Sequence, residues 1–329
     1  MERRVFGRTG LKLGVLGFGC GAVGGLMVRG SAADQERAVA RAIEAGVNYF
    51  DTAPDYGSGE SEKVLGRVLR AVKADVVVGT KVRLREAVPG RIGAEITASI
   101  EASLSRMGRD SVDLFQLHNP IAPAGAPAHL SVATVLDEVI PAFERLQADG
   151  KVRYLGITAI GEAASMHEVV ASGLIDSAQV PLNMLNPSPV RGLPKGFPAS
   201  DYRQLMLRAR DNGVGIIGIR VLAAGALAGL DGRHPTAMQS VPPIGSSATY
   251  DADLANARKL LPLVQEGFAA NLAEAAMRFA ISNDAMTTVL VGFSDLDHLD
   301  AAIAAFGKGP LAPDAMARVT QLQARIAQG

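Results

Sequence analysis

The hydrophobic residues of this chain fall into short runs that alternate with longer segments of helical periodicity. The runs are almost uniformly apolar, which is typical of parallel strands buried on both faces. The predicted strands lie at 15–19, 47–51, 76–81, 112–118, 154–158, 177–180, 214–219 and 288–291. The predicted helices lie at about 34–45, 61–71, 92–106, 131–149, 161–172, 199–212, 271–283 and 296–306. Because eight strands alternate with eight helices, the pattern favours a closed (β/α)8 barrel of the TIM type over a doubly wound sheet.

Three segments fall outside this alternation. Residues 3–13 are expected to form an N-terminal β-hairpin, and residues 312–327 an extra C-terminal helix. Residues 223–270 are a long loop after the seventh strand, and long loops at the carboxyl end of a barrel commonly carry function. We expect residues 1–329 to form a single α/β domain.

The composition narrows the classes of partner. The chain has 33 basic and 33 acidic residues and no basic patch, which argues against nucleic acid and anionic membranes. Apolar residues make up 48%, yet no run is long enough to span a bilayer, and the N-terminus lacks an apolar signal core. We therefore expect a cytoplasmic protein. Its single cysteine, Cys20, excludes a disulfide framework, and the spacing of its five histidines predicts no metal site.

The stretch 50–62 passes from the end of a predicted strand into a helix through a turn rich in Gly, Pro and Asp. Asp51 ends the strand and Tyr56 follows in the loop, where barrel enzymes place their chemistry. Ser61 is expected to cap the helix, and Glu62 suits the positive end of the helix dipole.

Two further polar residues end the next two predicted strands, Lys81 and His118. Because adjacent strand ends are neighbours in a barrel, both should meet Asp51 and Tyr56. The four groups suit proton delivery to a carbonyl. Lys81 is expected to lower the pKa of Tyr56, Asp51 to keep Lys81 charged, and His118 to hold the carbonyl oxygen. None of them supplies electrons, so the hydride must come from a cofactor.

With these residues in place, the chain resembles the aldo-keto reductase superfamily over nearly its whole length. The motifs that carry the resemblance are Phe6-Gly7-Arg8-Thr9-Gly10-Leu11, Leu16-Gly17-Phe18-Gly19, Asp51-Thr52-Ala53 through Tyr56-Gly57 to Ser61-Glu62, Lys81, Asp113-Leu114-Phe115-Gln116-Leu117-His118, Gly150-Lys151-Val152-Arg153-Tyr154-Leu155-Gly156-Ile157-Thr158 and Leu222-Ala223-Ala224-Gly225-Ala226-Leu227. Their order and spacing are specific. The chain is most similar to the branch of sugar and pyridoxal dehydrogenases.

The resemblance implies an NAD(P)-dependent oxidoreductase that transfers a hydride between nicotinamide and an aldehyde, ketone or sugar-like substrate. By position, Asp51, Tyr56, Lys81 and His118 match the family's catalytic tetrad, with Tyr56 as general acid–base. Asp55 and Asn119 join Tyr56 and His118 as implied substrate contacts. No strand–GxGxxG–helix unit is present, in agreement with a family that binds its cofactor without a Rossmann fold. The implied cofactor contacts are Gly19, Cys20, Gly21, Asp51, Thr158, Gln179, Ile219, Arg220, Val221, Leu222, Gly225, Leu227, Gly292, Phe293, Ser294 and His298.

The chain departs from the family pattern at the cofactor. Thr158-Ala159 stands where many members have Ser-Asn, and Arg220 lies where many stack an aromatic ring on the nicotinamide. Gly292 and Ser294 occupy positions that are often Lys or Arg, the residues that hold a 2′-phosphate. The cofactor is therefore NADP or NAD, with at most a modest preference for NADP(H). With no Trp and 5% aromatic residues, the chain favours a small or polar substrate.

Two other readings remain open. A Schiff-base aldolase would use Lys81 as a neutral nucleophile, which a neighbouring Asp51 disfavours. A cofactor-sensing regulatory subunit would bind nicotinamide tightly with weak or no turnover. For the oxidoreductase we expect a monomer or a weak homo-oligomer.

Overall fold

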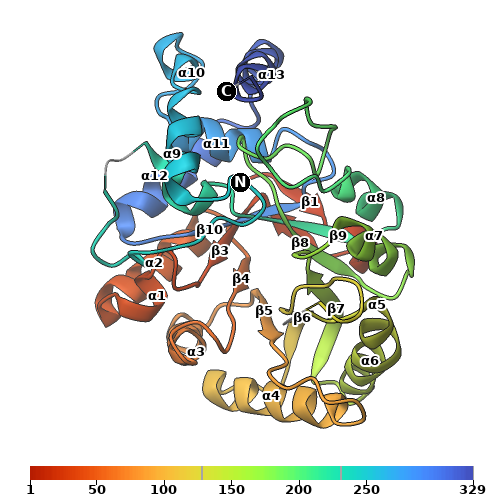
Figure 1. The fold of residues 1–329 in the computed structure, drawn as a ribbon. Helices are drawn as coiled ribbons and strands as arrows, with labels where there is room; N and C mark the ends of the chain where they lie inside the picture. Colours follow the sequence, from red (N-terminus) through yellow and green to blue (C-terminus); the bar gives the residue numbers. More distant parts are fainter. Residues whose placement is uncertain (127–128, 230–231, 329) are drawn as a thin grey trace.

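Eight parallel strands close into a barrel in the computed structural model, which describes residues 1–126, 129–229 and 232–328 (Figure 1). Their order is the order of the sequence, and β10 pairs with β3 to close the ring. The barrel strands are β3 Leu16–Gly19, β4 Tyr49–Asp51, β5 Val77–Val82, β6 Val112–Leu117, β7 Val152–Thr158, β8 Ser177–Pro181, β9 Gly215–Ile219 and β10 Thr288–Gly292. The (β/α)8 barrel predicted from the hydrophobic pattern is confirmed.

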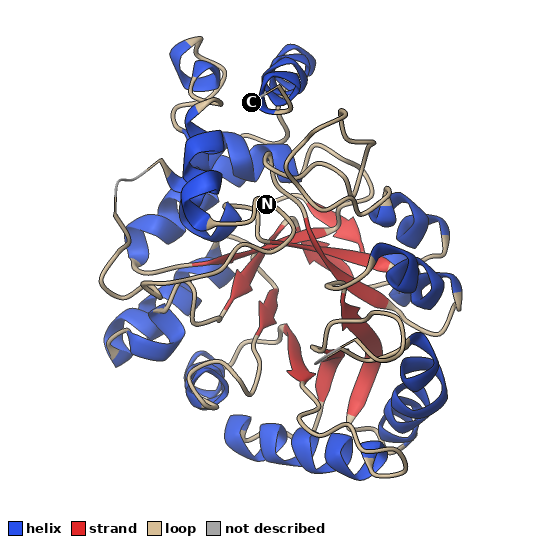
Figure 2. Cartoon of the chain, in the orientation of Figure 1, coloured by secondary structure: helices blue, strands red, loops and turns tan. Residues whose placement is uncertain are grey.

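The helices surround the strands on the outside of the barrel (Figure 2). They are α1 Leu26–Arg29, α2 Ala32–Glu44, α3 Glu60–Val72, α4 Ile92–Met107, α5 Val132–Thr134, α6 Ile140–Ala148, α7 Ala163–Ala171, α8 Leu205–Asp211, α9 Tyr250–Arg258, α10 Pro262–Gln265, α11 Leu272–Ala280, α12 Leu296–Gly307 and α13 Pro313–Ile326. Among the described residues, none of these helices combines the length and the apolar character needed to cross a membrane.

An antiparallel pair, β1 Arg3–Val5 and β2 Lys12–Gly14, packs against one end of the barrel. The short helix η1 (Gly7–Thr9) joins the two strands. Phe6 lies in a buried cluster with Tyr49, Leu114 and Ile217, which come from three barrel strands. These apolar side chains fill the end of the barrel that the hairpin covers. The polar groups therefore lie at the opposite end, at the carboxyl ends of the strands.

Three predicted helices differ from those observed. The segment 131–149 is interrupted by a π-helical turn, η2 Val135–Val139, which ends two residues before Pro141. Proline has no N–H and its ring crowds the carbonyl four residues earlier, which explains the irregular turn. The helix expected at 199–212 begins only at Leu205, because Arg203 and Gln204 have left-handed backbones.

The third difference concerns helix α3. Ser61 was expected to cap its N-terminus, and this prediction is wrong. The helix begins after Gly59, and the Ser61 hydroxyl donates instead to the carbonyl of Cys20 at 2.8 Å. Ser61 is fully buried, so its hydroxyl must find a partner inside the protein. It therefore ties the loop after β4 to the loop after β3.

The long loop predicted at 223–270 contains ordered structure. It begins with the 3-10 segment η3 (Ala223–Ala228) and later includes α9 and α10. Residues 230 and 231 of this loop lie outside the described residues. The remainder reaches back to the N-terminal part of the barrel, where the N–H of Met238 donates to the carbonyl of Val23 at 3.1 Å.

Candidate active site

The carboxylate of Asp51 is the centre of a buried polar cluster. One oxygen accepts from the Lys81 ammonium, and the other accepts from the Tyr49 hydroxyl at 2.8 Å and the Gln179 amide at 2.7 Å. The strand register brings these groups together, because Asp51 pairs with Gly79 on β5, two residues before Lys81. Each oxygen is satisfied, so the carboxylate is stable despite its burial.

Lys81 is fully buried and is held by Asp51 and by the carbonyl of Thr52 at 2.9 Å. Burial alone would lower the pKa of its amine, but the charge of Asp51 and the neighbouring Tyr56 outweigh that effect and raise the pKa above its ordinary value. Lys81 is therefore an ammonium at neutral pH. A charged ammonium is not a nucleophile, which argues against the Schiff-base reading.

Tyr56 stands over this cation. The Lys81 Nζ lies 4.9 Å from the centre of its ring, and the His118 ring meets it edge-on at 6.0 Å. A β-carbon at Gly21 would lie 3.6 Å from the Tyr56 ring, so the loop after β3 covers one side of it. The tetrad residues predicted from the sequence therefore do lie together.

Lys81 does act to lower the pKa of Tyr56, as expected, but a second effect, burial, is larger and was not expected. Burial raises the pKa of the phenol above its ordinary value, and the positive charge of Lys81 offsets only part of that rise. Burial disfavours the charged phenolate, while a cation stabilises it. At neutral pH Tyr56 is thus a protonated phenol, which is the form that donates a proton.

His118 follows β6 and is neutral. Burial, together with the charges of Lys81 and Arg83, lowers the pKa of His118 from 6.5 to about 3. Its Nδ1 is buried and has no hydrogen-bond partner among the described residues. A neutral imidazole next to a tyrosine hydroxyl can donate a hydrogen bond to a ligand oxygen without adding a charge.

The depressed pKa of His118 predicts a pH dependence of stability. An imidazole in the unfolded chain takes up a proton near pH ~6.5, whereas folded His118 does so only near pH 3. Protonation therefore favours the unfolded state, so the free energy of unfolding should fall as the pH falls from about 6.5 towards 3. Denaturant unfolding at a series of pH values measures this loss.

The matched control for this prediction is His118→Gln, which cannot titrate. It should show a shallower loss of stability over the same pH range, and the imidazole signals of His118 should report a neutral ring above about pH 4 in NMR. Identical pH profiles for the two proteins would contradict the assigned cause.

A second set of predicted residues lines the contact between β10 and the loop after β3. A β-carbon on Gly24 would come within 2.5 Å of the backbone of Gly292 and Phe293. The N–H of Leu26 donates to the carbonyl of Phe293 at 3.0 Å, and the Ser294 hydroxyl donates to the carbonyl of Gly24 at 2.8 Å. These contacts leave a pocket of about 330 Å³ beside Ser294.

Asp295 and His234 lie on the rim of this pocket. Asp295 caps α12, and its carboxylate approaches His234 at 3.2 Å and His298 at 3.8 Å. The two imidazole rings lie 5.7 Å apart, edge to face. His298 was expected here as the sole donor. His234 was missed because it comes from the long loop, and no local pattern places that loop over β10.

The segment after β9 has a strained backbone. Three non-glycine residues, Arg220, Ala223 and Ala224, have positive φ, as does Gly225. A left-handed backbone costs an L-residue about 1–2 kcal/mol and is common where a loop binds a ligand. Ile219 and Leu222 are half-buried, whereas Val221 and Leu227 are fully buried.

Arg220, whose role the sequence left open between the cofactor and an ion pair, forms no ion pair with any described residue. Its guanidinium donates to the carbonyl of Pro242 at 3.1 Å, and its own carbonyl accepts from Asn183 at 2.9 Å. It is half-buried at the end of β9, and its positive charge lowers the pKa of Tyr56 slightly. Arg220 is therefore near enough to Tyr56 for the two groups to interact electrostatically.

Several predicted contacts are engaged elsewhere. Both groups of the Asn119 amide bond to the backbone of Leu84, at 2.8 and 2.9 Å. Asp55 forms an ion pair with Arg85. Cys20 is buried, and burial raises the pKa of its thiol far above the ordinary value, so Cys20 is a protonated thiol at neutral pH.

The residues present fit a nicotinamide cofactor. The Thr158 hydroxyl is buried at the end of β7 and has no partner among the described residues. A buried hydroxyl without a partner is costly, and a bound carboxamide would satisfy it. Gly19 ends β3, on the opposite side of the ring of strand ends, and Gly21 follows it, so neither adds side-chain bulk there. In the part of the chain that the structure describes, no cluster of His, Cys, Asp or Glu could hold a metal ion.

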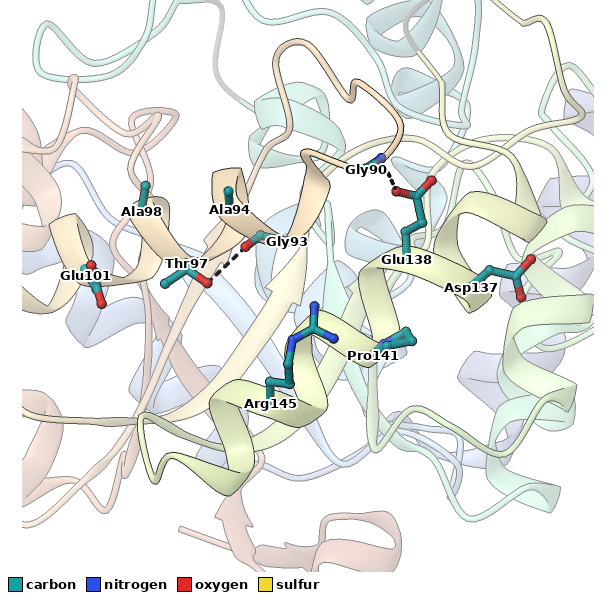
Figure 3. Close-up of a pocket in the computed structure, with 10 residues that line it drawn as sticks. All are labelled: Gly90, Gly93, Ala94, Thr97, Ala98, Glu101, Asp137, Glu138, Pro141 and Arg145. Atoms are coloured by element: carbon teal, nitrogen blue, oxygen red, sulfur yellow. Dashed lines mark hydrogen bonds between the residues drawn. The ribbon is translucent and has the colours of Figure 1, made fainter.

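One pocket lies away from this cluster. It is a groove of about 660 Å³ between α4 and α6, lined by Gly93, Glu101, Glu138 and Arg145 among others (Figure 3). Glu138 points towards Gly90, whose N–H it accepts at 3.0 Å. None of the predicted site residues lines it, so the groove is separate from the buried cluster around Asp51.

Comparison with known proteins places the chain among oxidoreductases. Residues 15–324 match the sequence profile of the Aldo/keto reductase family. L-galactose dehydrogenase from Arabidopsis thaliana is 28% identical over 314 residues, 93% of this chain and 88% of that protein. The NADH-specific methylglyoxal reductase from Escherichia coli K12 is 26% identical over 247 residues, 70% of each chain. The holo form of aldo-keto reductase AKR11C1 from Bacillus halodurans gives a TM-score of 0.71 at 26% identity, over 98% of this chain and 96% of that one.

Proposed function

We propose, on the premise that the chain belongs to the aldo/keto reductase family and is an NAD(P)H-dependent oxidoreductase, that Tyr56 delivers the proton in the reduction of an aldehyde, ketone or sugar-like carbonyl. The observation that carries this proposal is the convergence of Asp51, Lys81, Tyr56 and His118 at three successive strand ends. The Asp51–Lys81 ion pair and the Lys81–Tyr56 contact are both present.

The proposed role of each of the four residues follows from the geometry of the site. The carbonyl oxygen accepts hydrogen bonds from the Tyr56 hydroxyl and the neutral His118 imidazole. As negative charge develops on that oxygen, Tyr56 transfers its proton. The Lys81 ammonium stabilises the phenolate that remains, and Asp51 keeps Lys81 charged and in place. When bound, the nicotinamide cofactor supplies the hydride.

The residues proposed to hold the cofactor come from four loops. The Thr158 hydroxyl would bind the carboxamide, and the loop after β3 would contribute backbone contacts. The strained segment 219–227 and the segment 292–298 would hold the phosphates and the adenosine. Gln179, which bonds Asp51, acts by positioning that carboxylate.

The regulatory alternative makes a different prediction. A sensing subunit would bind nicotinamide without turning over carbonyls. The tetrad of this chain is complete and correctly partnered, which such a subunit does not need. Turnover of a panel of aldehydes, sugars and pyridoxal, in both directions and with both cofactors, separates the two functions.

We predict that NAD(H) is accepted, with at most a modest preference for NADP(H). Gly292, Phe293 and Ser294 offer no cation for a 2′-phosphate, and the Asp295 carboxylate repels one. A missing charged contact costs about 1.5–3 kcal/mol, or roughly ten- to a hundredfold in affinity. A relative that is NADH-specific by name supports this choice. The measurement is the ratio of kcat/KM for the two cofactors at fixed ionic strength.

Asp295→Asn sharpens the test, because it removes the charge but keeps the oxygen that caps α12. The ratio should shift towards NADP(H). Asp300→Asn, on the outer face of the same helix and paired with Arg41, is the matched control and should leave the ratio unchanged. A preference of unaltered protein for NADP(H) above about a hundredfold would contradict the prediction.

A further inference from the structure

A polar pocket lies among the loops that follow two of the tetrad residues, Lys81 and His118. Its volume is about 600 Å³, within the usual range for small-molecule sites, and its walls include Arg83, Arg85, Asn119, His129 and Ser131. These residues come from the loops that follow β5 and β6.

Three loops tie this pocket to the catalytic residues. Arg83 follows Lys81 by two positions, and Asn119 directly follows His118. Arg85 forms an ion pair with Asp55, the residue before Tyr56. Asn119 also fastens the two loops together through the backbone of Leu84. Two residues of the pocket wall are therefore within one or two positions of a tetrad residue along the chain, and a third is paired with the neighbour of Tyr56.

The strand register indicates where Arg83 points. Lys81 pairs with Gln116 and Val82 with Leu117, so Arg83 and His118 come next across the same pair of strands. Arg83 is the first residue past the end of β5, and the alternation of side chains, extended by this one residue, places it on the same side as Lys81. Its charge contributes to the lowered pKa of His118, after burial and Lys81.

Arg83 is exposed, and its side chain forms neither an ion pair nor a hydrogen bond with any described residue. Arg85 is already paired, and Glu86 is the other charged residue of the wall. A cation without a partner, beside a polar pocket and a neutral imidazole, is suited to a ligand anion. The guanidinium plane matches a carboxylate or a phosphate with two parallel hydrogen bonds.

We propose that Arg83 binds an anionic group at the end of the substrate remote from the reacting carbonyl. The substrate is then a small aldehyde or sugar that carries a carboxylate or a phosphate monoester. This inference rests on the proposed function, because it places the carbonyl between Tyr56 and His118 and the anion in the adjoining pocket.

The test uses matched pairs of carbonyl substrates. Butanal is compared with 4-oxobutanoate, and glyceraldehyde with glyceraldehyde 3-phosphate, by kcat/KM with each cofactor. Unaltered protein should prefer at least one anion over its neutral partner by about tenfold, and added salt should reduce that preference. Arg83→Gln should lower the anion-to-neutral ratio about tenfold, and Arg83→Lys should retain part of it. The pair that responds identifies carboxylate or phosphate as the group.

Arg210→Gln is the matched control. It makes the same change of charge near the C-terminal end of α8, in a surface pair with Asp211, and should leave the ratio as it is. If the neutral aldehydes are reduced, but no anion is preferred and Arg83→Gln leaves the ratios unchanged, the inference is overturned. If neither member of any pair is reduced with either cofactor, the proposed function fails and the inference falls with it.

Discussion

Tyr56→Phe is expected to lower turnover by about 10²–10⁴, the usual contribution of a general acid, with little change in the affinity for NAD(P)H. The phenylalanine ring keeps the packing against Gly21 and the contact with Lys81, so only the transferable proton is lost. Turnover is followed by the absorbance of the reduced nicotinamide, and affinity by its fluorescence on binding.

Tyr154→Phe is the matched control for this substitution. The Tyr154 hydroxyl donates to the carbonyl of Thr9 at 3.1 Å, near the hairpin at the closed end of the barrel. Its loss removes a hydrogen bond of similar kind far from the tetrad, so turnover should stay close to that of the unaltered protein. A Tyr56→Phe enzyme that keeps most of its turnover would show that the proton comes from another group.

Lys81→Met is expected to remove both activity and a large part of the stability. It leaves the Asp51 carboxylate buried without its cation, and breaking a buried ion pair on one side costs about 3–5 kcal/mol. Methionine fills a similar volume, so the loss is one of charge and not of packing. The free energy of unfolding in denaturant measures it.

The double variant Asp51→Asn/Lys81→Met tests the cause. It removes both charges and should recover much of the stability while remaining inactive, since the proton relay is still missing. Lys151→Met breaks an exposed ion pair with Glu101 and serves as the control, with little effect on either property. Unaltered stability in Lys81→Met would mean that Tyr49 and Gln179 suffice to hold Asp51.

The barrel strands could be predicted because a parallel strand that is buried on both faces has a short, uniformly apolar sequence. The positions of Asp51, Lys81 and His118 at the strand ends followed from the same pattern. Tyr49 was missed, although it precedes Asp51 by two residues and the alternation of a strand puts both on one side. The alternation of side chains along β4 would therefore have predicted Tyr49 as a neighbour of Asp51.

Other features of the site could not be predicted from the local sequence. The net pKa of Tyr56 depends on how deeply the loop after β3 buries it, and this is a property of the packed molecule. The hydroxyl of Ser61 takes a partner 41 residues away instead of the nearby helix end. His234 reaches Asp295 only because the long loop folds back over β10. In each case a tertiary contact outweighs the local preference.

The central claim is that a hydride passes from nicotinamide to a carbonyl carbon while Tyr56 supplies the proton. Its most direct test is the reduction of a small aldehyde by a cofactor that carries deuterium at the transferred position of its nicotinamide, with the product analysed by mass spectrometry. We predict one deuterium on the former carbonyl carbon and a solvent proton on the oxygen, with product formation greatly slowed in Tyr56→Phe. A product that forms without deuterium from the cofactor, or at an unchanged rate in Tyr56→Phe, would contradict the account.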